Sequence, residues 1–220
     1  MGFLIGLTLL TAILDWYVFY KGWKIEFLLK PLTMVFLFSF LLTSTALQGI
    51  ALWFGIGVIL SLAGDIFMML PKEQFKAALI VFLLAHIAYI IGLNPTLPPV
   101  NAFGMIMAVL LGMIGARLYK RISAGLLAQG KESLQKPVFA YTAVITIMLL
   151  SALLTFSRPE WDRNAAITVS LGAALFMLSD AILAWTKFVK PIKNGRVINV
   201  AIYHLGQIVL IYGVVMQSPL

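Results

Sequence analysis

Two aspartates and two histidines lie within long apolar stretches of the sequence, where ionisable side chains are rare. His86 follows Asp65 by 21 residues, and His204 follows Asp180 by 24 residues. An ionisable group inside a membrane-spanning segment costs several kcal/mol and usually faces a bundle interior or an aqueous cavity. These four residues, together with Asp15, are therefore the candidates for chemistry.

Two carboxyl groups that share a low-dielectric site tend to divide into one acid and one base near neutral pH. Such a pair suits the cleavage of acetal-like carbon–oxygen bonds through oxocarbenium transition states. Acyl transfer is less favoured because no nucleophile elbow or Ser-His-Asp signature is found, although Ser61 and Ser179 leave a serine hydrolase open. No tight ligand spacing supports a metal site. We therefore expect Asp65 and Asp180 to cleave a carbon–oxygen bond without a metal.

The composition indicates that these residues belong to a membrane protein. The chain is 62% hydrophobic and 11% charged, with a mean hydropathy of +1.02. A soluble domain is roughly half apolar and about a quarter charged. The absence of Cys excludes disulfides, thiolate metal sites and a Cys nucleophile. The net charge of +8 does not predict a nucleic-acid partner, because the basic residues lie in short loops beside anionic lipid headgroups.

Eight apolar segments of near-bilayer length predict an all-α, polytopic membrane protein that forms one domain over residues 1–220. The first segment carries Asp15 and lacks the basic start and cleavage site of a signal peptide. Turn signals such as Pro71 separate the segments. The predicted spans are 3–20, 27–44, 50–70, 77–93, 100–118, 137–157, 165–186 and 197–217.

Basic residues predict the orientation of these helices. Of the sixteen Lys and Arg residues, only Arg158 and Arg163 follow an even-numbered span, which leaves fourteen in the loops after odd-numbered spans. The positive-inside rule places those basic loops in the cytoplasm, so both termini are expected outside. Short loops and the absence of Cys also suit a bacterial inner membrane.

The candidate residues fall at one depth in the membrane. Asp65 comes seven residues before Lys72, and Asp180 comes seven residues before Lys187. At about 1.5 Å per residue, both carboxylates lie roughly 10 Å below the cytoplasmic boundary. We therefore expect a polar cavity that opens toward the cytoplasmic leaflet. Three further ionisable residues fall at a similar depth: Asp15, His86 and His204.

The two halves of the chain share an order of motifs. Lys30-Pro31 opens the second predicted span and Lys136-Pro137 opens the sixth. An aspartate then ends the third and seventh spans, and a histidine follows in the fourth and eighth. The order predicts a parallel four-plus-four repeat with units 1–95 and 100–220. The alternative is that the shared order of motifs arose by chance, because the composition is strongly biased toward apolar residues.

Each polar residue also has a structural interpretation. An intramembrane histidine often makes an interhelical hydrogen bond, and Asp15 can cap a helix or reach the headgroups. Lys30 and Lys136 mark helix ends at the interface, or contact a phosphate. Asp65 and Asp180 lie at the same predicted depth and have no matching buried cations. A purely structural role explains this pair less well than it explains the other polar residues. Asp65 and Asp180 therefore remain the strongest candidates for catalysis.

A set of short polar motifs also occurs in a fixed order along most of the chain. The ordered set resembles the lysoplasmalogenase-like YhhN family of integral membrane proteins. The resemblance implies hydrolysis of the vinyl ether bond of a lysoplasmalogen, which releases a fatty aldehyde and glycerophosphoethanolamine or glycerophosphocholine. It also implies that two acidic residues form the catalytic pair and that no cofactor is needed. The matching motifs are Lys30-Pro31, Gly64-Asp65, Ala85-His86 with Tyr89, Ser179-Asp180, and Tyr203-His204 with Gln207.

The chemistry that the resemblance implies agrees with the reasoning from the residues. A carboxylic acid can protonate the β-carbon of the enol ether, and the other carboxylate can stabilise the oxocarbenium ion and activate water. A single-tailed lysophospholipid can enter between helices from the bilayer, and Lys30 or Lys136 can hold its phosphate. The remaining candidates for substrate binding are His86, Tyr89, Tyr203, His204 and Gln207.

Two other classes of function remain open from the sequence. The same aspartates could relay protons in a proton-coupled transporter or lipid flippase. The absence of a predicted mid-membrane helix break and the position of the polar groups in one leaflet weigh against this alternative. A lipid esterase or amidase is the other class.

Overall fold

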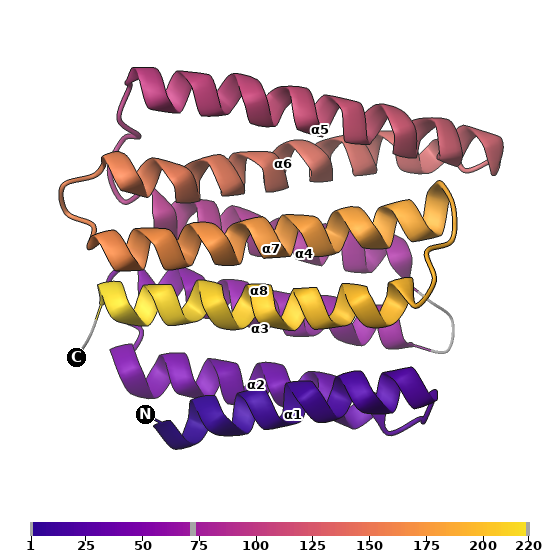
Figure 1. The fold of residues 1–220 in the computed structure, drawn as a ribbon, viewed down its shortest axis with the longest axis horizontal. Helices are drawn as coiled ribbons and strands as arrows, with labels where there is room; N and C mark the ends of the chain where they lie inside the picture. Colours follow the sequence, from indigo (N-terminus) through magenta and orange to yellow (C-terminus); the bar gives the residue numbers. More distant parts are fainter. Residues whose placement is uncertain (1, 71–73, 219–220) are drawn as a thin grey trace.

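The computed structural model describes residues 2–70 and 74–218, and these form a bundle of long helices (Figure 1). Eight of the described helices are long and apolar enough to cross a membrane, which confirms the predicted all-α, polytopic fold. Two short 3-10 helices, η1 (Glu132–Leu134) and η2 (Thr155–Ser157), flank α6. The long helices are α1 (Gly2–Lys21), α2 (Glu26–Thr45), α3 (Ala51–Met69), α4 (Phe75–Leu93), α5 (Ala102–Ala128), α6 (Gln135–Leu154), α7 (Arg163–Phe188) and α8 (Gly195–Gln217).

Helix α5 departs most from its predicted span. It was expected to end near residue 118 but continues to Ala128. Its basic residues stay exposed on one face, while Ile122 and Leu126 on the other face pack against Phe188 of α7. This amphipathic face keeps the helix intact beyond the apolar stretch. Two predicted loop residues, Pro71 and Lys72, lie outside the described residues.

Helix α8 occupies the centre of the arrangement. It packs along α7 and also contacts α1, α2 and α3, while α4 packs against α6. In Figure 1, α5 forms the upper edge, α1 and α2 form the lower edge, and α8 lies over α3 between them. Both chain ends lie at the same end of the bundle, as an even number of spans requires. The side of the membrane on which they lie remains a prediction.

Glycines allow two helix pairs to approach closely. A Cβ added at Gly172 of α7 would lie 2.3 Å from the backbone nitrogen of Leu210 in α8. In the other pair, Gly57 of α3 lies against the ring of Tyr89 in α4. Small residues at such contacts let membrane helices pack backbone to backbone. The α3–α4 and α7–α8 pairs therefore hold the helices that carry the candidate aspartates firmly in place.

The orientation can be tested directly because the chain has no native Cys. Leu97→Cys lies in the connection between α4 and α5, and Lys193→Cys lies in the connection between α7 and α8; both native side chains are exposed. In intact bacterial cells, a membrane-impermeant maleimide should label the cysteine at position 97, and the cysteine at position 193 only after the membrane is broken. The Cys-free protein provides the background. The opposite labelling pattern would reverse the predicted orientation.

Candidate functional site

Asp65 lies near the end of α3 and is held by residues from two other helices. The Lys30 ammonium of α2 lies 2.8 Å from Asp65 Oδ1. The Tyr203 hydroxyl of α8 donates a hydrogen bond of 2.8 Å to Asp65 Oδ2. The Asp65 side chain is only 1% exposed. Both carboxylate oxygens are thus occupied, as a buried charge requires.

Asp180 lies on α7 and meets a different set of partners. Its Oδ2 accepts a hydrogen bond from the Tyr141 hydroxyl of α6 and lies 3.4 Å from His86 Nε2 of α4. The same His86 nitrogen is 3.0 Å from the Tyr141 hydroxyl. Asp180 is 16% exposed, and its Oδ1 makes no hydrogen bond within the described part of the chain. One oxygen of Asp180 is therefore without a hydrogen-bond partner among the described residues.

The two carboxylates line one cavity, which we call the inner cavity. It measures about 100 Å³ and is also lined by Lys30, Tyr141 and Tyr203. The rest of its wall is mostly apolar and comes from α3 to α8. At roughly 30 Å³ per water, the space suits a few waters or a small part of a larger molecule. The structure thus brings Asp65 and Asp180, which are far apart in sequence, to a single site.

Three other predicted site residues lie in the core beside this cavity rather than on its wall. The Tyr89 hydroxyl donates to Gln207 Oε1 at 2.9 Å, which joins α4 to α8. His204 Nδ1 accepts a hydrogen bond of 3.1 Å from the indole of Trp16 in α1. Tyr89, Gln207 and His204 are fully buried. These contacts match the structural interpretation of polar residues that link helices.

The remaining predicted residues have contrasting positions. Lys136 is exposed at the start of α6 and makes no ion pair with any described residue. Asp15 of α1 is completely buried, and neither of its carboxylate oxygens has a hydrogen-bond partner among the described residues. Neither residue lines the inner cavity. Lys30 is therefore the one predicted lysine that reaches a described candidate aspartate.

Sequence reasoning missed Tyr141, whose hydroxyl donates a hydrogen bond to Asp180. A charged side chain stands out within an apolar span, whereas a phenol is neutral near pH 7 and does not. A signal was nevertheless present, because Tyr141 follows Lys136 by five residues and so lies inside the span. Interfacial tyrosines are found at the ends of spans. A tyrosine inside a span needs another explanation, and the hydrogen bond to Asp180 provides it.

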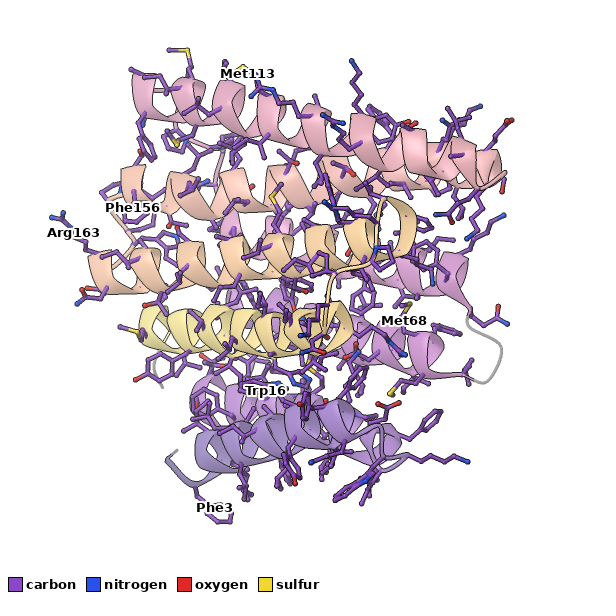
Figure 2. All side chains as sticks on the ribbon, turned by 45° about the vertical axis from the view of Figure 1, so that its right-hand side comes forward. Phe3, Trp16, Met68, Met113, Phe156 and Arg163 are labelled. Atoms are coloured by element: carbon purple, nitrogen blue, oxygen red, sulfur yellow. The ribbon has the colours of Figure 1, made fainter. Side chains whose placement is uncertain are left out.

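Two further hollows adjoin the inner cavity. The first, the vestibule, measures about 490 Å³ and shares Lys30, Met68 and Asn199 with it. Met68 is labelled at its place on α3 in Figure 2. The second, the α5–α6 groove, measures about 380 Å³ and shares Thr142 with the inner cavity. The inner cavity therefore lies between a polar vestibule and an apolar groove.

Among the described residues no group of three or more His, Cys, Asp or Glu side chains could hold a metal ion.

The ion pair between Lys30 and Asp65 yields a prediction about stability. Lys30→Met should lower the free energy of unfolding by up to about 3 kcal/mol, because it leaves a buried carboxylate without its cation. In an Asp65→Asn background the same substitution should cost much less. Denaturant titration in mixed micelles measures this double-mutant cycle. Lys136→Met, at the exposed counterpart, should change stability by no more than about 0.5 kcal/mol. An equal cost of Lys30→Met in both backgrounds would contradict the pairing.

Comparison with known proteins agrees with this architecture. Residues 25–214 match the YhhN family. The uncharacterized membrane protein YhhN of Shigella flexneri is 25% identical over 197 residues, which are 87% of this chain and 88% of that protein. No solved structure matches the chain.

Mammalian relatives carry a functional name. The lysoplasmalogenase TMEM86B of Rattus norvegicus is 28% identical over 152 residues, which are 68% of this chain and 56% of the rat protein. The lysoplasmalogenase TMEM86A of Homo sapiens is 26% identical over 160 residues, which are 70% of this chain and 62% of the human protein. The matched regions thus span less than two thirds of both mammalian proteins. The family match covers most of the chain, and this integral membrane protein therefore belongs to the YhhN family.

Proposed function

We propose that the protein is a membrane hydrolase that cleaves the vinyl ether bond of lysoplasmalogens. The products are a fatty aldehyde and glycerophosphoethanolamine or glycerophosphocholine. The observation that carries this proposal is the pair of carboxylates, Asp65 and Asp180, on the wall of one largely apolar cavity. The lysoplasmalogenases among the relatives support the same reaction. The proposed setting is a bacterial inner membrane, with the cavity toward the cytoplasmic leaflet.

Asp180 acts as the general acid in this proposal. Its Oδ1 is free of hydrogen bonds to described residues, and its side chain is the more exposed of the two. Tyr141 and His86 hold Oδ2 and so fix the direction of Oδ1. A protonated Asp180 can then deliver its proton to the β-carbon of the enol ether. A positioned carboxylic acid in such a role contributes roughly 10²- to 10⁴-fold to the rate.

Asp65 supplies the fixed negative charge. Protonation of the β-carbon leaves a positive charge shared by the α-carbon and the ether oxygen. A carboxylate that Lys30 and Tyr203 hold rigidly needs no reorganisation to stabilise that charge. Because both Asp65 oxygens already have partners, this residue acts through its field rather than by transferring a proton.

Water completes the reaction. After giving up its proton, Asp180 is a carboxylate and can accept a proton from the water that attacks the oxocarbenium carbon. A carbon–oxygen bond forms, Asp180 is protonated again, and the product is a hemiacetal. The hemiacetal hydroxyl then passes its proton to the ether oxygen, the bond between that oxygen and the α-carbon breaks, and the aldehyde carbonyl forms as the glycerol hydroxyl leaves. Protons and oxygen atoms therefore balance with one water consumed.

The three hollows follow the order of groups in a lysoplasmalogen. The vinyl ether of that lipid lies between a polar glycerophosphate and one apolar tail, and the inner cavity lies between the vestibule and the α5–α6 groove. The inner cavity, at about 100 Å³, holds the reacting bond but not a long tail. The groove shares Thr142 with it and is lined mainly by small and apolar residues of α5 and α6. The tail is therefore proposed to leave through this groove toward the lipid.

Removing either carboxylate should abolish most activity. Asp180→Asn should lower kcat for lysoplasmalogen by about 10³-fold because the general acid is lost. Asp65→Asn should lower it by roughly 10²- to 10³-fold because the fixed charge is lost. Mass spectrometry of a lysolipid panel incubated with purified protein measures aldehyde release. Asp162→Asn is the matched control, since Asp162 caps the other end of α7 through its side chain and Asn caps equally well.

The same panel separates the alternative functions. Wild-type protein that leaves the vinyl ether intact would overturn the proposal. Release of a fatty acid from acyl lysolipids would instead identify an esterase. Movement of lipid or protons across liposomes without any turnover would favour the transporter or flippase.

Filling the α5–α6 groove should affect long tails selectively. Gly112 lines the groove, and a Cβ added there meets no atom within 4 Å, so a Phe side chain can begin at this position without a clash at Cβ. The variant should raise KM several-fold for a long-chain lysoplasmalogen and leave KM for a short-chain analogue unchanged. Met113→Phe is the control, because Met113 does not line the groove and points away from the bundle on α5 (Figure 2). Equal KM changes for both chain lengths would rule out the groove as the path of the tail.

A further inference from the structure

The vestibule carries charges of both signs near the cytoplasmic ends predicted for the helices. Arg196 and Lys187 line it together with Lys30, and Glu26 lines it as well. At about 490 Å³, its volume falls in the range of roughly 300–1,000 Å³ that small-molecule sites occupy. The hollow is therefore large enough for a polar headgroup and has the charges to orient one.

The positive charges of the vestibule are not equivalent. Lys30 is paired with Asp65 at 2.8 Å and is therefore committed to the reacting site. Arg196 is the second residue of α8, where the unpaired backbone N–H groups of the helix start also favour an anion. Its guanidinium lies 5.1 Å from the ring centre of Phe19 and makes no ion pair with a described residue. Arg196 is thus a better site for a phosphate than Lys30.

Glu26 provides the opposite charge. It is the first residue of α2 and is half-buried, and its carboxylate makes no hydrogen bond or ion pair with another described residue. A glutamate at this position would repel a simple phosphate, so it argues against a site for anions alone. It would attract the ammonium group of ethanolamine or choline. The positive charge of Arg196 and the negative charge of Glu26 together suit a zwitterionic ligand.

We propose that the vestibule binds the zwitterionic phosphoethanolamine or phosphocholine headgroup of a lysolipid. Arg196 binds the phosphate, and Glu26 binds the ammonium group. This assignment rests on the proposed function in taking a lysolipid as the substrate. Because the vestibule and inner cavity share Lys30 and Asn199, a headgroup bound there leaves the glycerol at the entrance to the aspartates.

The first experiment measures binding without catalysis. The probe is a saturated ether analogue, 1-O-alkyl-glycerophosphocholine, which has no vinyl ether to cleave, and titration calorimetry follows its binding to the full chain in detergent. Arg196→Gln should weaken binding about tenfold, which corresponds to about 1.4 kcal/mol. Lys193→Gln is the control, because Lys193 is exposed in the connection just before α8 but does not line the vestibule. Unchanged affinity in Arg196→Gln would overturn the phosphate assignment.

The second experiment tests the zwitterion. Glu26→Gln should weaken binding of the phosphocholine analogue about fivefold. It should leave binding of 1-O-alkyl-glycerol 3-phosphate, which has a phosphate and no ammonium group, unchanged or tighter. Equal weakening for both probes would show that Glu26 does not recognise the ammonium group and would overturn this half of the proposal.

The two proposals fail in distinguishable ways. If the analogue binds and responds to Arg196→Gln while lysoplasmalogen stays intact, the headgroup site stands and the hydrolase proposal fails. If lysoplasmalogen is hydrolysed and Arg196→Gln changes neither KM nor analogue binding, the headgroup site fails alone. With active protein, Arg196→Gln should raise KM about tenfold and leave kcat nearly unchanged; a fall in kcat alone would overturn a headgroup role.

Discussion

The burial of the Asp65 carboxylate inside an apolar bundle is the constraint on which the arrangement of the helices depends. A buried ion costs several kcal/mol even after relaxation, so it needs a close counter-ion and further hydrogen bonds. Lys30 and Tyr203 satisfy both needs, at 2.8 Å each. These partners come from α2 and α8, so three helices must meet at one depth. This meeting explains why α8 lies in the middle of the bundle and contacts α1, α2, α3 and α7.

Each aspartate has a side-chain partner from the other predicted half of the chain. Asp65 of the first half receives Tyr203 from α8, and Asp180 of the second half receives His86 from α4. Each half therefore completes the site of the other, and neither four-helix unit would hold a finished site alone. The exchange is not symmetrical, because Lys30 pairs with Asp65 while Tyr141 takes the position beside Asp180. Duplication of an ancestral four-helix unit would explain why each half supplies a partner to the aspartate of the other half. Later divergence would explain why the partners of the two aspartates differ.

Hydropathy and depth were enough to predict the eight helices and the common level of the aspartates. Both quantities depend on position along a helix, which the sequence gives directly. The partners depend on rotation about the helix axis and on which helices are neighbours, and these were not predicted. Lys136 has the sequence context of Lys30 but faces outward, while His204 bonds Trp16 rather than lining the inner cavity. Tyr141 was missed because a neutral phenol does not stand out in a search for charges.

The different surroundings of the two carboxylates are the basis for assigning them different roles in the proposed reaction. Asp65 has both oxygens occupied and is 1% exposed, whereas Asp180 keeps one oxygen without a described partner and is 16% exposed. A residue whose oxygens are all engaged can stabilise charge but cannot readily exchange a proton, while a residue with a free oxygen can do so. The cation that fixes Asp65, Lys30, also lines the vestibule, so it lies where the polar entrance meets the reacting site. The buried ion pair joins α2 to α3, and the Tyr203 hydrogen bond adds α8. In the proposed function the same pair separates the roles of the aspartates and lies between the headgroup and the scissile bond.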